Sequence, residues 1–185
     1  MILLPGTVCE RKGQIDLIEA LSLIGEHASK IRCFIVGDRA GEYSDRLRAA
    51  HKSLPNLTRG RIHVVPEMPD IARYYSAADI FVCTSRIESF PRVILEAMAS
   101  GLPIITTPVY GIREQVQENV NALFYKPGDA RELADRITSL LVDPGLRQRL
   151  AGNSKTVLEG LQDFDTMLLA YGRVFREAWL SGRTR

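Results

Sequence analysis

The chain has 185 residues, enough for one domain that buries roughly 70% of the surface its unfolded chain exposes. Apolar residues make up 45% and charged residues 25%, which excludes collagen-like, low-complexity and acidic disordered classes. The formal net charge of +2 is too small to indicate duplex nucleic acid or an anionic membrane as a partner, so an anionic ligand has to be met by local charges.

Short apolar runs alternate with amphipathic stretches, which is the pattern of parallel strands joined by crossover helices. The apolar runs are the expected strands, at 2–6, 31–37, 62–66, 79–84, 103–107 and 122–125. The amphipathic stretches are the expected helices, at 14–28, 42–54, 70–78, 91–101 and 129–143. The sequence therefore predicts an α/β fold, a Rossmann-like three-layer domain with a parallel sheet of about six strands flanked by helices.

The last part of the chain, at 144–154 and 155–182, reads as two further helices with no strand between them. The second helix carries a row of large apolar side chains on one side: Phe164, Leu168, Tyr171, Phe175 and Trp179. We expect residues 151–185 to be a helical extension of the domain formed by residues 1–150. An apolar helix side of this kind is expected to pack against another surface, either on this domain or on a second one.

The three cysteines, Cys9, Cys33 and Cys83, are an odd number without a CxxC pair, and each is next to apolar residues. This pattern fits reduced thiols packed as small hydrophobic side chains. No apolar run approaches the roughly 18 residues of a membrane span, and the first six residues are too short and too uncharged for a signal peptide. We therefore expect a cytoplasmic protein without a transmembrane segment.

In an open parallel sheet the ligand site lies outside the carboxyl ends of the strands. The turn after the first strand places Arg11 and Lys12 just before Gly13 and a helix. Two cations at the positive end of a helix dipole are unfavourable unless an anion such as a phosphate binds there. The alternative is a solvated pair offset by Glu10 and Asp16. The glycine spacing matches neither the dinucleotide-binding fingerprint nor a P-loop.

Two glutamates, Glu88 and Glu96, flank the start of the helix expected at 91–101. Apolar residues cover most of that helix, so we expect Glu96 to be partly buried, beside Arg92. One interpretation is an ion pair between Arg92 and Glu96, one helical turn apart. The other is a pair of carboxylates that accept hydrogen bonds from hydroxyl groups next to an anion-binding helix N-terminus. A nucleotide sugar has both the phosphates and the vicinal hydroxyls that this site would bind.

Several segments together resemble the C-terminal, donor-binding domain of retaining GT-B glycosyltransferases of the group 1, or GT4-like, family. They are 6–13, 36–38, 74–79, the Glu88-x7-Glu96 pair in ESFPRVILEAMASGLPII, and PGDARELADRI. The resemblance extends from residue 2 to about residue 150 and implies one half of a GT-B fold, with the N-terminal acceptor domain absent from this chain. It implies a glycosyltransferase that is inactive without that domain, located in the cytoplasm or, through the missing domain, at the inner face of the membrane.

The resemblance also implies roles for single residues. The phosphate-binding lysine of the family falls on Lys12, which is followed by Gly13, and the resemblance also places Gly37, of the matching segment 36–38, in the donor-binding site. The glutamate that accepts from the ribose hydroxyls falls on Glu96. The glutamate that faces the transferred sugar falls on Glu88, to which we assign a catalytic role of orientation and electrostatic stabilisation.

The rest of the implied donor site is main chain and turn. N–H groups of the turn and first helical residues would bind the sugar and the distal phosphate: Ser89, Phe90, Arg92 and Val93. The base would lie near the turn after the third strand, in contact with Val65, Pro66 and Met68. The resemblance implies no metal and no cofactor, with the nucleoside diphosphate sugar as a substrate.

The sequence departs from the family pattern at two positions. Thr7 stands where most members carry an arginine, so one phosphate cation is missing, and Arg11 or Arg92 is a candidate to replace it. Pro91 stands where many members have glycine, and proline has no N–H to donate. Neither change removes the carboxylates or Lys12.

Two other functions remain compatible with this pattern. A sugar nucleotide epimerase shares the fold, but it needs further acid and base residues than the histidines His27, His51 and His63 supply. A non-catalytic GT-B-like assembly domain would use the helix that carries Phe175 and Trp179 as its docking surface. Saturable binding of a nucleoside diphosphate distinguishes the donor-binding domain from the assembly domain.

Overall fold

The computed structural model describes residues 1–161 and 163–182. Its core is a six-stranded sheet in the order β3-β2-β1-β4-β5-β6, in which every neighbouring pair is parallel. The strands are β1 Ile2–Pro5, β2 Cys33–Asp38, β3 Ile62–Pro66, β4 Ile80–Cys83, β5 Ile104–Thr106 and β6 Ala122–Phe124. The predicted α/β class and the predicted parallel sheet are confirmed.

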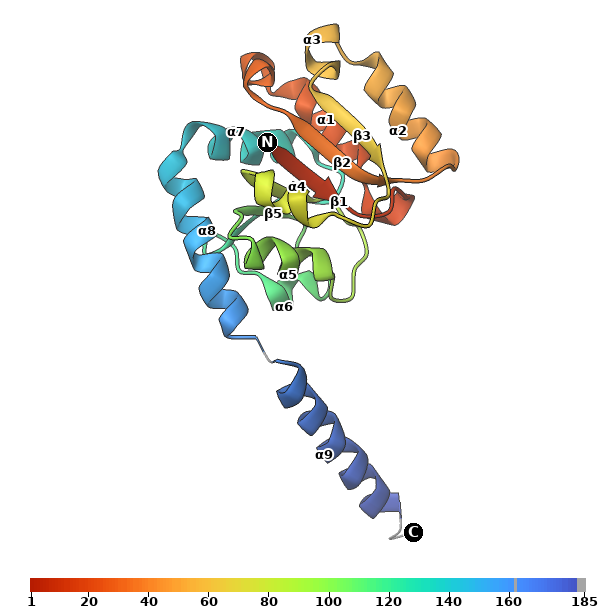
Figure 1. The fold of residues 1–185 in the computed structure, drawn as a ribbon, viewed down its shortest axis with the longest axis vertical. Coiled ribbons are helices and arrows are strands. Elements are labelled where there is room, and N and C mark those ends of the chain that lie inside the picture. The colour runs from red at the N-terminus through yellow and green to blue at the C-terminus, as the bar shows by residue number, and fades with distance from the viewer. Residues whose placement is uncertain (162, 183–185) are drawn as a thin grey trace.

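The helices connect these strands and follow them at the end of the chain (Figure 1). They are α1 Ile15–Leu23, α2 Glu42–Ser53, α3 Asn56–Arg59, α4 Ala72–Ala77, α5 Arg92–Ala99, α6 Ile112–Gln115, α7 Ala130–Val142, α8 Pro144–Glu159 and α9 Phe164–Gly182. Two short 3-10 segments are η1 Glu10–Lys12 and η2 Gly25–Lys30. The short helices α3 and α6 were not predicted.

Helix boundaries differ most from the prediction in two regions, after α1 and between α8 and α9. The stretch 14–28 is not one helix, because Gly25 adopts a left-handed conformation with φ of 58° after α1 and the chain continues as η2. The helix expected at 144–154 extends to Glu159, so residue 150 lies inside α8. Asp143 caps this helix, since its side chain accepts from the N–H of Leu146 at 2.8 Å.

Alternate residues of each strand point to opposite faces of the sheet, and each face has its own apolar cluster. Ile2 and Leu4 of β1 join the cluster formed with α1, α2 and α7, whereas Leu3 joins the cluster formed with α4, α5 and α6. The helix α8 contacts both clusters, through Leu150 and then Val157. The domain therefore has the three layers that the sequence predicts.

All three cysteines are free thiols. Cys33 and Cys83 are buried, as predicted, and Cys9 is half-buried. Burial raises the pKa of the Cys33 thiol to about 12, because the low-dielectric interior disfavours the thiolate. Cys33 therefore packs in the core as a neutral thiol.

The last helix, α9, extends away from the body of the domain (Figure 1). None of its described residues is buried, and the predicted apolar side, Phe164, Leu168, Tyr171, Phe175 and Trp179, is exposed. A groove of about 1040 Å³ separates its first turns from α5 and the end of α8. Within 1–161 and 163–182, no helix is both long and apolar enough to cross a membrane.

Candidate functional site

The turns after β1 and β4 lie side by side, because these strands are neighbours at the point where the winding of the sheet reverses. The side chain of Thr84 donates to the carbonyl of Lys12 at 2.7 Å, and the N–H of Arg86 donates to the carbonyl of Arg11 at 2.7 Å. The two segments with the strongest sequence signals therefore form one surface at the carboxyl edge of the sheet.

Two glycines allow close packing here, Gly37 of β2 against the turn after β1, and Gly13 of that turn against the end of β4. Gly37 has φ of 123°, and a Cβ built on it would lie 2.4 Å from the carbonyl oxygen of Gly6. Gly13 has φ of 64°, and its Cβ would lie 2.5 Å from the carbonyl oxygen of Thr84. Both positions exclude side chains by backbone contact as well as by conformation.

Gly37→Ala is expected to destabilise the fold by at least about 2 kcal/mol, since it combines an unfavourable positive φ with a collision against main chain that cannot move freely. Gly152→Ala is the matched control, because Gly152 lies in the interior of α8 with open space around it. We expect that control to stabilise the fold by about 0.5–1 kcal/mol. Urea unfolding followed by circular dichroism measures both, and equal stability of Gly37→Ala and the parent would contradict the close approach.

Lys12 and Glu88 form an ion pair beneath this surface, between Nζ and Oε1. The same carboxylate oxygen lies 3.2 Å from Nη1 of Arg11 and accepts from the hydroxyl of Ser85 at 3.1 Å. Glu88 is 9% exposed and the Lys12 side chain 13%. The predicted phosphate lysine and the predicted sugar-facing glutamate are thus direct partners.

The interpretation of Arg11 and Lys12 as a solvated pair offset by Glu10 and Asp16 is wrong. Glu10 instead pairs with Arg46 at 2.8 Å on the surface. Asp16 is buried, and both of its oxygens accept from the guanidinium of Arg86, at 2.8 and 2.9 Å. The neighbours in sequence are therefore not the partners in space.

The Asp16–Arg86 pair ties the start of α1 to the turn that carries Glu88. Asp16 also accepts from the N–H of Gly128 at 3.0 Å, in the segment before α7. The hydrogen bonds to Asp16 raise the pKa of the Arg86 guanidinium above its usual value, so Arg86 stays charged. Sequence reasoning missed Arg86, because nothing near either residue marks a partner 70 positions away.

The turn before α5 presents main-chain donors. Among the described residues, the N–H groups of Ser89, Phe90, Arg92 and Val93 donate to no protein acceptor. The segment at Gly111 packs directly against this turn, because a Cβ on Gly111 would lie only 1.4 Å from the carbonyl oxygen of Ser89. The amide of Gln115 also donates to the carbonyl of Pro91 at 3.1 Å. A rigid helix N-terminus with free donors can bind an anion.

A cavity of about 300 Å³ adjoins this helix N-terminus. Its lining is Pro5, Gly6, Thr7, Val36, Gly37, Glu67, Met68, Ile71, Tyr75, Arg92, Val93 and Glu96. The structure thus brings together five of the predicted site residues: Gly37, Met68, Arg92, Val93 and Glu96. Lys12 lies next to the lining, with Nζ 3.9 Å from the position of a Cβ on Gly6.

The other predicted residues lie around this cavity without lining it. Gly13 and Glu88 belong to the packed turns, and Ser89 belongs to the turn before α5. Phe90 lines the groove between α5 and α9. Val65 and Pro66 end the edge strand β3, next to Met68 in the chain. Thr7, where the family's arginine is missing, does line the cavity, and so does Arg92.

Glu96 differs from the prediction, because it is exposed and not partly buried. No ion pair joins it to Arg92 in the described residues, so that interpretation is also wrong. Its Oε2 instead accepts from the hydroxyl of Tyr75 at 2.8 Å. Burial, then this hydrogen bond, raise the pKa of the Tyr75 phenol. Sequence reasoning quoted Tyr75 within the segment 74–79 but gave it no role.

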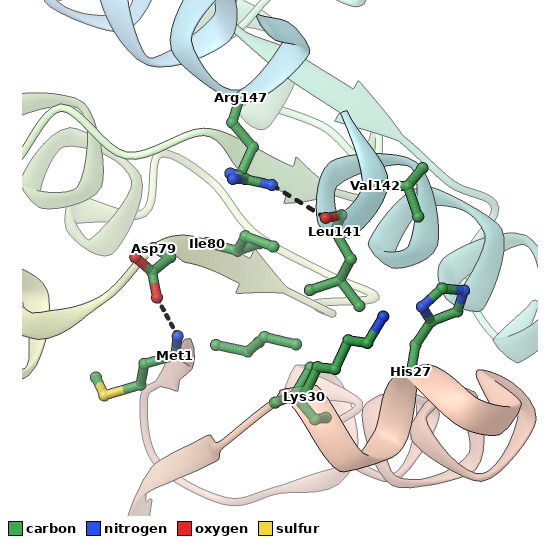
Figure 2. A pocket seen from close by; sticks show the side chains of 10 residues that line it. Met1, His27, Lys30, Asp79, Ile80, Leu141, Val142 and Arg147 are labelled. Carbon is green, nitrogen blue, oxygen red and sulfur yellow. Dashed lines mark hydrogen bonds and ion pairs between the residues drawn. The ribbon is translucent and has the colours of Figure 1, made fainter. Parts of the chain in front are cut away.

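A second cavity of about 340 Å³ lies at the other end of the strands, beside the amino ends of β1 and β4 (Figure 2). Its lining includes His27 and Lys30 of η2, and Arg147, which donates to the carbonyl of Leu141 at 3.3 Å. None of the predicted site residues lines it. In 1–161 and 163–182, no group of three or more His, Cys, Asp or Glu side chains is arranged to hold a metal ion.

Residues 1–157 match the family model described as glycosyl transferases group 1. The chain belongs to this family. It is 32% identical over 167 residues to the lipopolysaccharide core biosynthesis glycosyltransferase LpsE of Rhizobium meliloti, a match covering 90% of this chain and 46% of that protein. The predicted membership of the group 1 glycosyltransferases is therefore confirmed.

Solved structures agree with this assignment. HepE of Anabaena in complex with UDP superposes with a TM-score of 0.83 at 26% identity, over 95% of this chain and 48% of that chain. HepE has also been solved with UDP-glucose. The C-terminal domain of the group 1 glycosyl transferase LpcC of Francisella tularensis shares the fold, with a TM-score of 0.76 at 22% identity over 86% of this chain and 84% of that one. The chain spans about half the length of LpsE and of HepE.

Proposed function

We propose that this chain is the donor-binding domain of a glycosyltransferase that transfers a sugar from a nucleoside diphosphate sugar to an acceptor with retention. The sheet domain, with the helices α8 and α9 that follow it, would bind the donor, and the acceptor would be bound by a part of the protein outside this chain. One observation carries the proposal: unpartnered main-chain donors at the start of α5 lie between the Lys12–Glu88 pair and the cavity that holds Glu96. That arrangement suits a diphosphate joined to a ribose on one side and a sugar on the other.

In this proposal the donor's diphosphate binds the N–H groups of Ser89, Phe90, Arg92 and Val93. Lys12 supplies one positive charge. Arg92 supplies a second, replacing the arginine that the family carries at Thr7, and its position in the cavity lining without an ion-pair partner among the described residues supports this role. The positive end of the α5 dipole adds to the attraction.

The ribose hydroxyls would bind Glu96, and the base would lie beside Met68, near Val65 and Pro66. Uridine diphosphate is the donor nucleotide that the comparison favours, because HepE has been solved with UDP and with UDP-glucose. The sugar would face Glu88. As the bond to the sugar breaks, Lys12 and the α5 dipole would stabilise the negative charge that develops on the leaving phosphate.

We expect UDP, GDP or ADP to raise the melting temperature of this chain in a saturable way. A ligand present at about 100 times its Kd stabilises the folded state by about 2.7 kcal/mol, which a thermal-shift assay detects easily. Uridine serves as the control ligand, since it lacks the phosphates that Lys12 and α5 would bind. If no nucleoside diphosphate moves the midpoint at millimolar concentration, the donor-binding proposal fails and the assembly domain becomes the better reading.

A further inference from the structure

We propose that Tyr75 is a positioning residue for the donor nucleotide: its hydroxyl holds one oxygen of Glu96, so that the other oxygen is set to accept from the ribose. This inference rests on the proposed function, because it takes Glu96 as the ribose-binding carboxylate. It adds a residue on α4 to a site otherwise built from the turns after the strands and the start of α5.

Tyr75 has the rigidity that such a role requires. Its side chain is only 4% exposed, although its neighbours on α4 at positions 72, 73, 76 and 77 are exposed. The ring stacks on that of Phe81 of β4, with centroids 6.1 Å apart and planes 17° from parallel. Because the sheet fixes Phe81, the hydroxyl of Tyr75 has one defined position relative to α5.

Glu96 has no such rigidity of its own. It is exposed, and a free glutamate side chain loses considerable rotamer freedom when a ligand orders it. In the described residues Oε2 accepts only from Tyr75, at 2.8 Å, and Oε1 accepts from no protein donor. The tyrosine therefore orders the carboxylate before the ligand arrives, which reduces the entropy lost on binding.

The hydrogen bond is not explained by the fold alone. The same hydroxyl lies 3.4 Å from the carbonyl oxygen of Val93, an acceptor that would satisfy a buried phenol without any carboxylate. The shorter and charge-assisted bond goes to Glu96, in the lining of the cavity that Tyr75 itself helps to form. Burial and the hydrogen bond to Glu96 raise the pKa of Tyr75, so the phenol remains a donor throughout the neutral range.

The test compares Tyr75→Phe with the parent chain by calorimetry, using UDP and 2′,3′-dideoxyuridine diphosphate. The substitution keeps the ring against Phe81 and removes only the hydroxyl. We expect affinity for UDP to fall about five- to tenfold, the size of effect expected for the loss of one ordinary hydrogen bond, and affinity for the dideoxy ligand to change less than about twofold. If Tyr75 had a purely structural role, the substitution would weaken the binding of both ligands equally. That result would overturn the inference.

Tyr74→Phe is the matched control. Tyr74 is the adjacent residue on α4, half-buried with its ring edge-on to Phe34 at 5.5 Å, and it makes no contact with Glu96. We expect it to leave the UDP-to-dideoxy ratio of the parent unchanged. Equal loss of that ratio in both variants would overturn the inference.

A third measurement tests the hydrogen bond between Tyr75 and Glu96 without the nucleotide. In carbon-13 NMR of the free chain, Tyr75→Phe should move the carboxyl resonance of Glu96, and Tyr74→Phe should not; an unmoved resonance would overturn the inference. If the parent chain binds neither ligand, the proposed function falls and the inference falls with it. If the parent binds UDP and Tyr75→Phe does not alter its preference for the ribose, only the inference falls.

Discussion

Lys12→Met is expected to lower the affinity of this chain for UDP about 100-fold. The lysine supplies a charge-assisted contact to the diphosphate beside the dipole of α5, in a place where its side chain is 13% exposed and poorly screened by salt. The same change should destabilise the fold by about 1–3 kcal/mol, because it leaves the carboxylate of Glu88 buried without its nearest cation. Arg11, at 3.2 Å, remains as a weaker partner and limits that loss.

The two effects of Lys12→Met can be separated by a second substitution. The double variant Lys12→Met, Glu88→Gln removes both charges, so we expect it to recover most of the stability and none of the affinity. Lys30→Met is the control, since Lys30 lines the cavity at the amino ends of β1 and β4, away from the candidate site. Calorimetry with UDP and urea unfolding measure the two quantities. Recovery of affinity in the double variant would mean that Lys12 acts only by neutralising Glu88.

The sequence predicted the sheet well because its strands are short, mostly apolar runs separated by turns and amphipathic helices. The segment 62–66 matches β3 residue for residue, and 2–6 differs from β1 by one residue. Helix ends were less predictable. The apolar spacing of 14–28 continues past Gly25, but the left-handed backbone there ends the α-helical geometry. The periodicity of apolar residues in the sequence does not predict such a helix end.

The candidate site was predictable in its positions but not in its pairings. Turns after parallel strands identify where side chains gather, and this placed Lys12 and Glu88 at the carboxyl ends of the strands, with Glu96 in the helix that follows. The partners are set by tertiary packing: Arg86 reaches Asp16 across 70 positions and Tyr75 reaches Glu96 across 21. Helical spacing suggested Arg92 as the partner of Glu96, yet a rigid donor from α4 takes that place.

The Lys12–Glu88 pair also changes what is expected of the second carboxylate. Glu88 pairs with the lysine that the proposal assigns to the phosphate, so carboxylate and phosphate would compete for one ammonium. A bare nucleoside diphosphate lacks the transferred sugar that Glu88 would contact in the proposed donor complex. Removing the charge of Glu88 should therefore free Lys12 and tighten UDP binding by about two- to fivefold.

In the two-domain enzyme of our proposal, Glu88→Gln should impair turnover, lowering kcat by about 100- to 1000-fold. The carboxylate would stabilise positive charge on the sugar as the bond to the phosphate breaks, an interaction made mainly in the transition state, and amides do this poorly. Such a loss appears in kcat and in kcat/KM alike. Glu96→Gln should instead raise KM for the donor sugar, because ribose binding is shared by the ground and transition states.

Glu10→Gln is the matched control for that experiment. Glu10 belongs to the same turn as Lys12, but its carboxylate pairs with Arg46 on the surface. Steady-state kinetics and calorimetry with UDP should then give low kcat with tighter UDP for Glu88→Gln, and parental values for Glu10→Gln. Weaker UDP binding by Glu88→Gln would show that the carboxylate supports Lys12 in the bound state and does not compete with the phosphate for it.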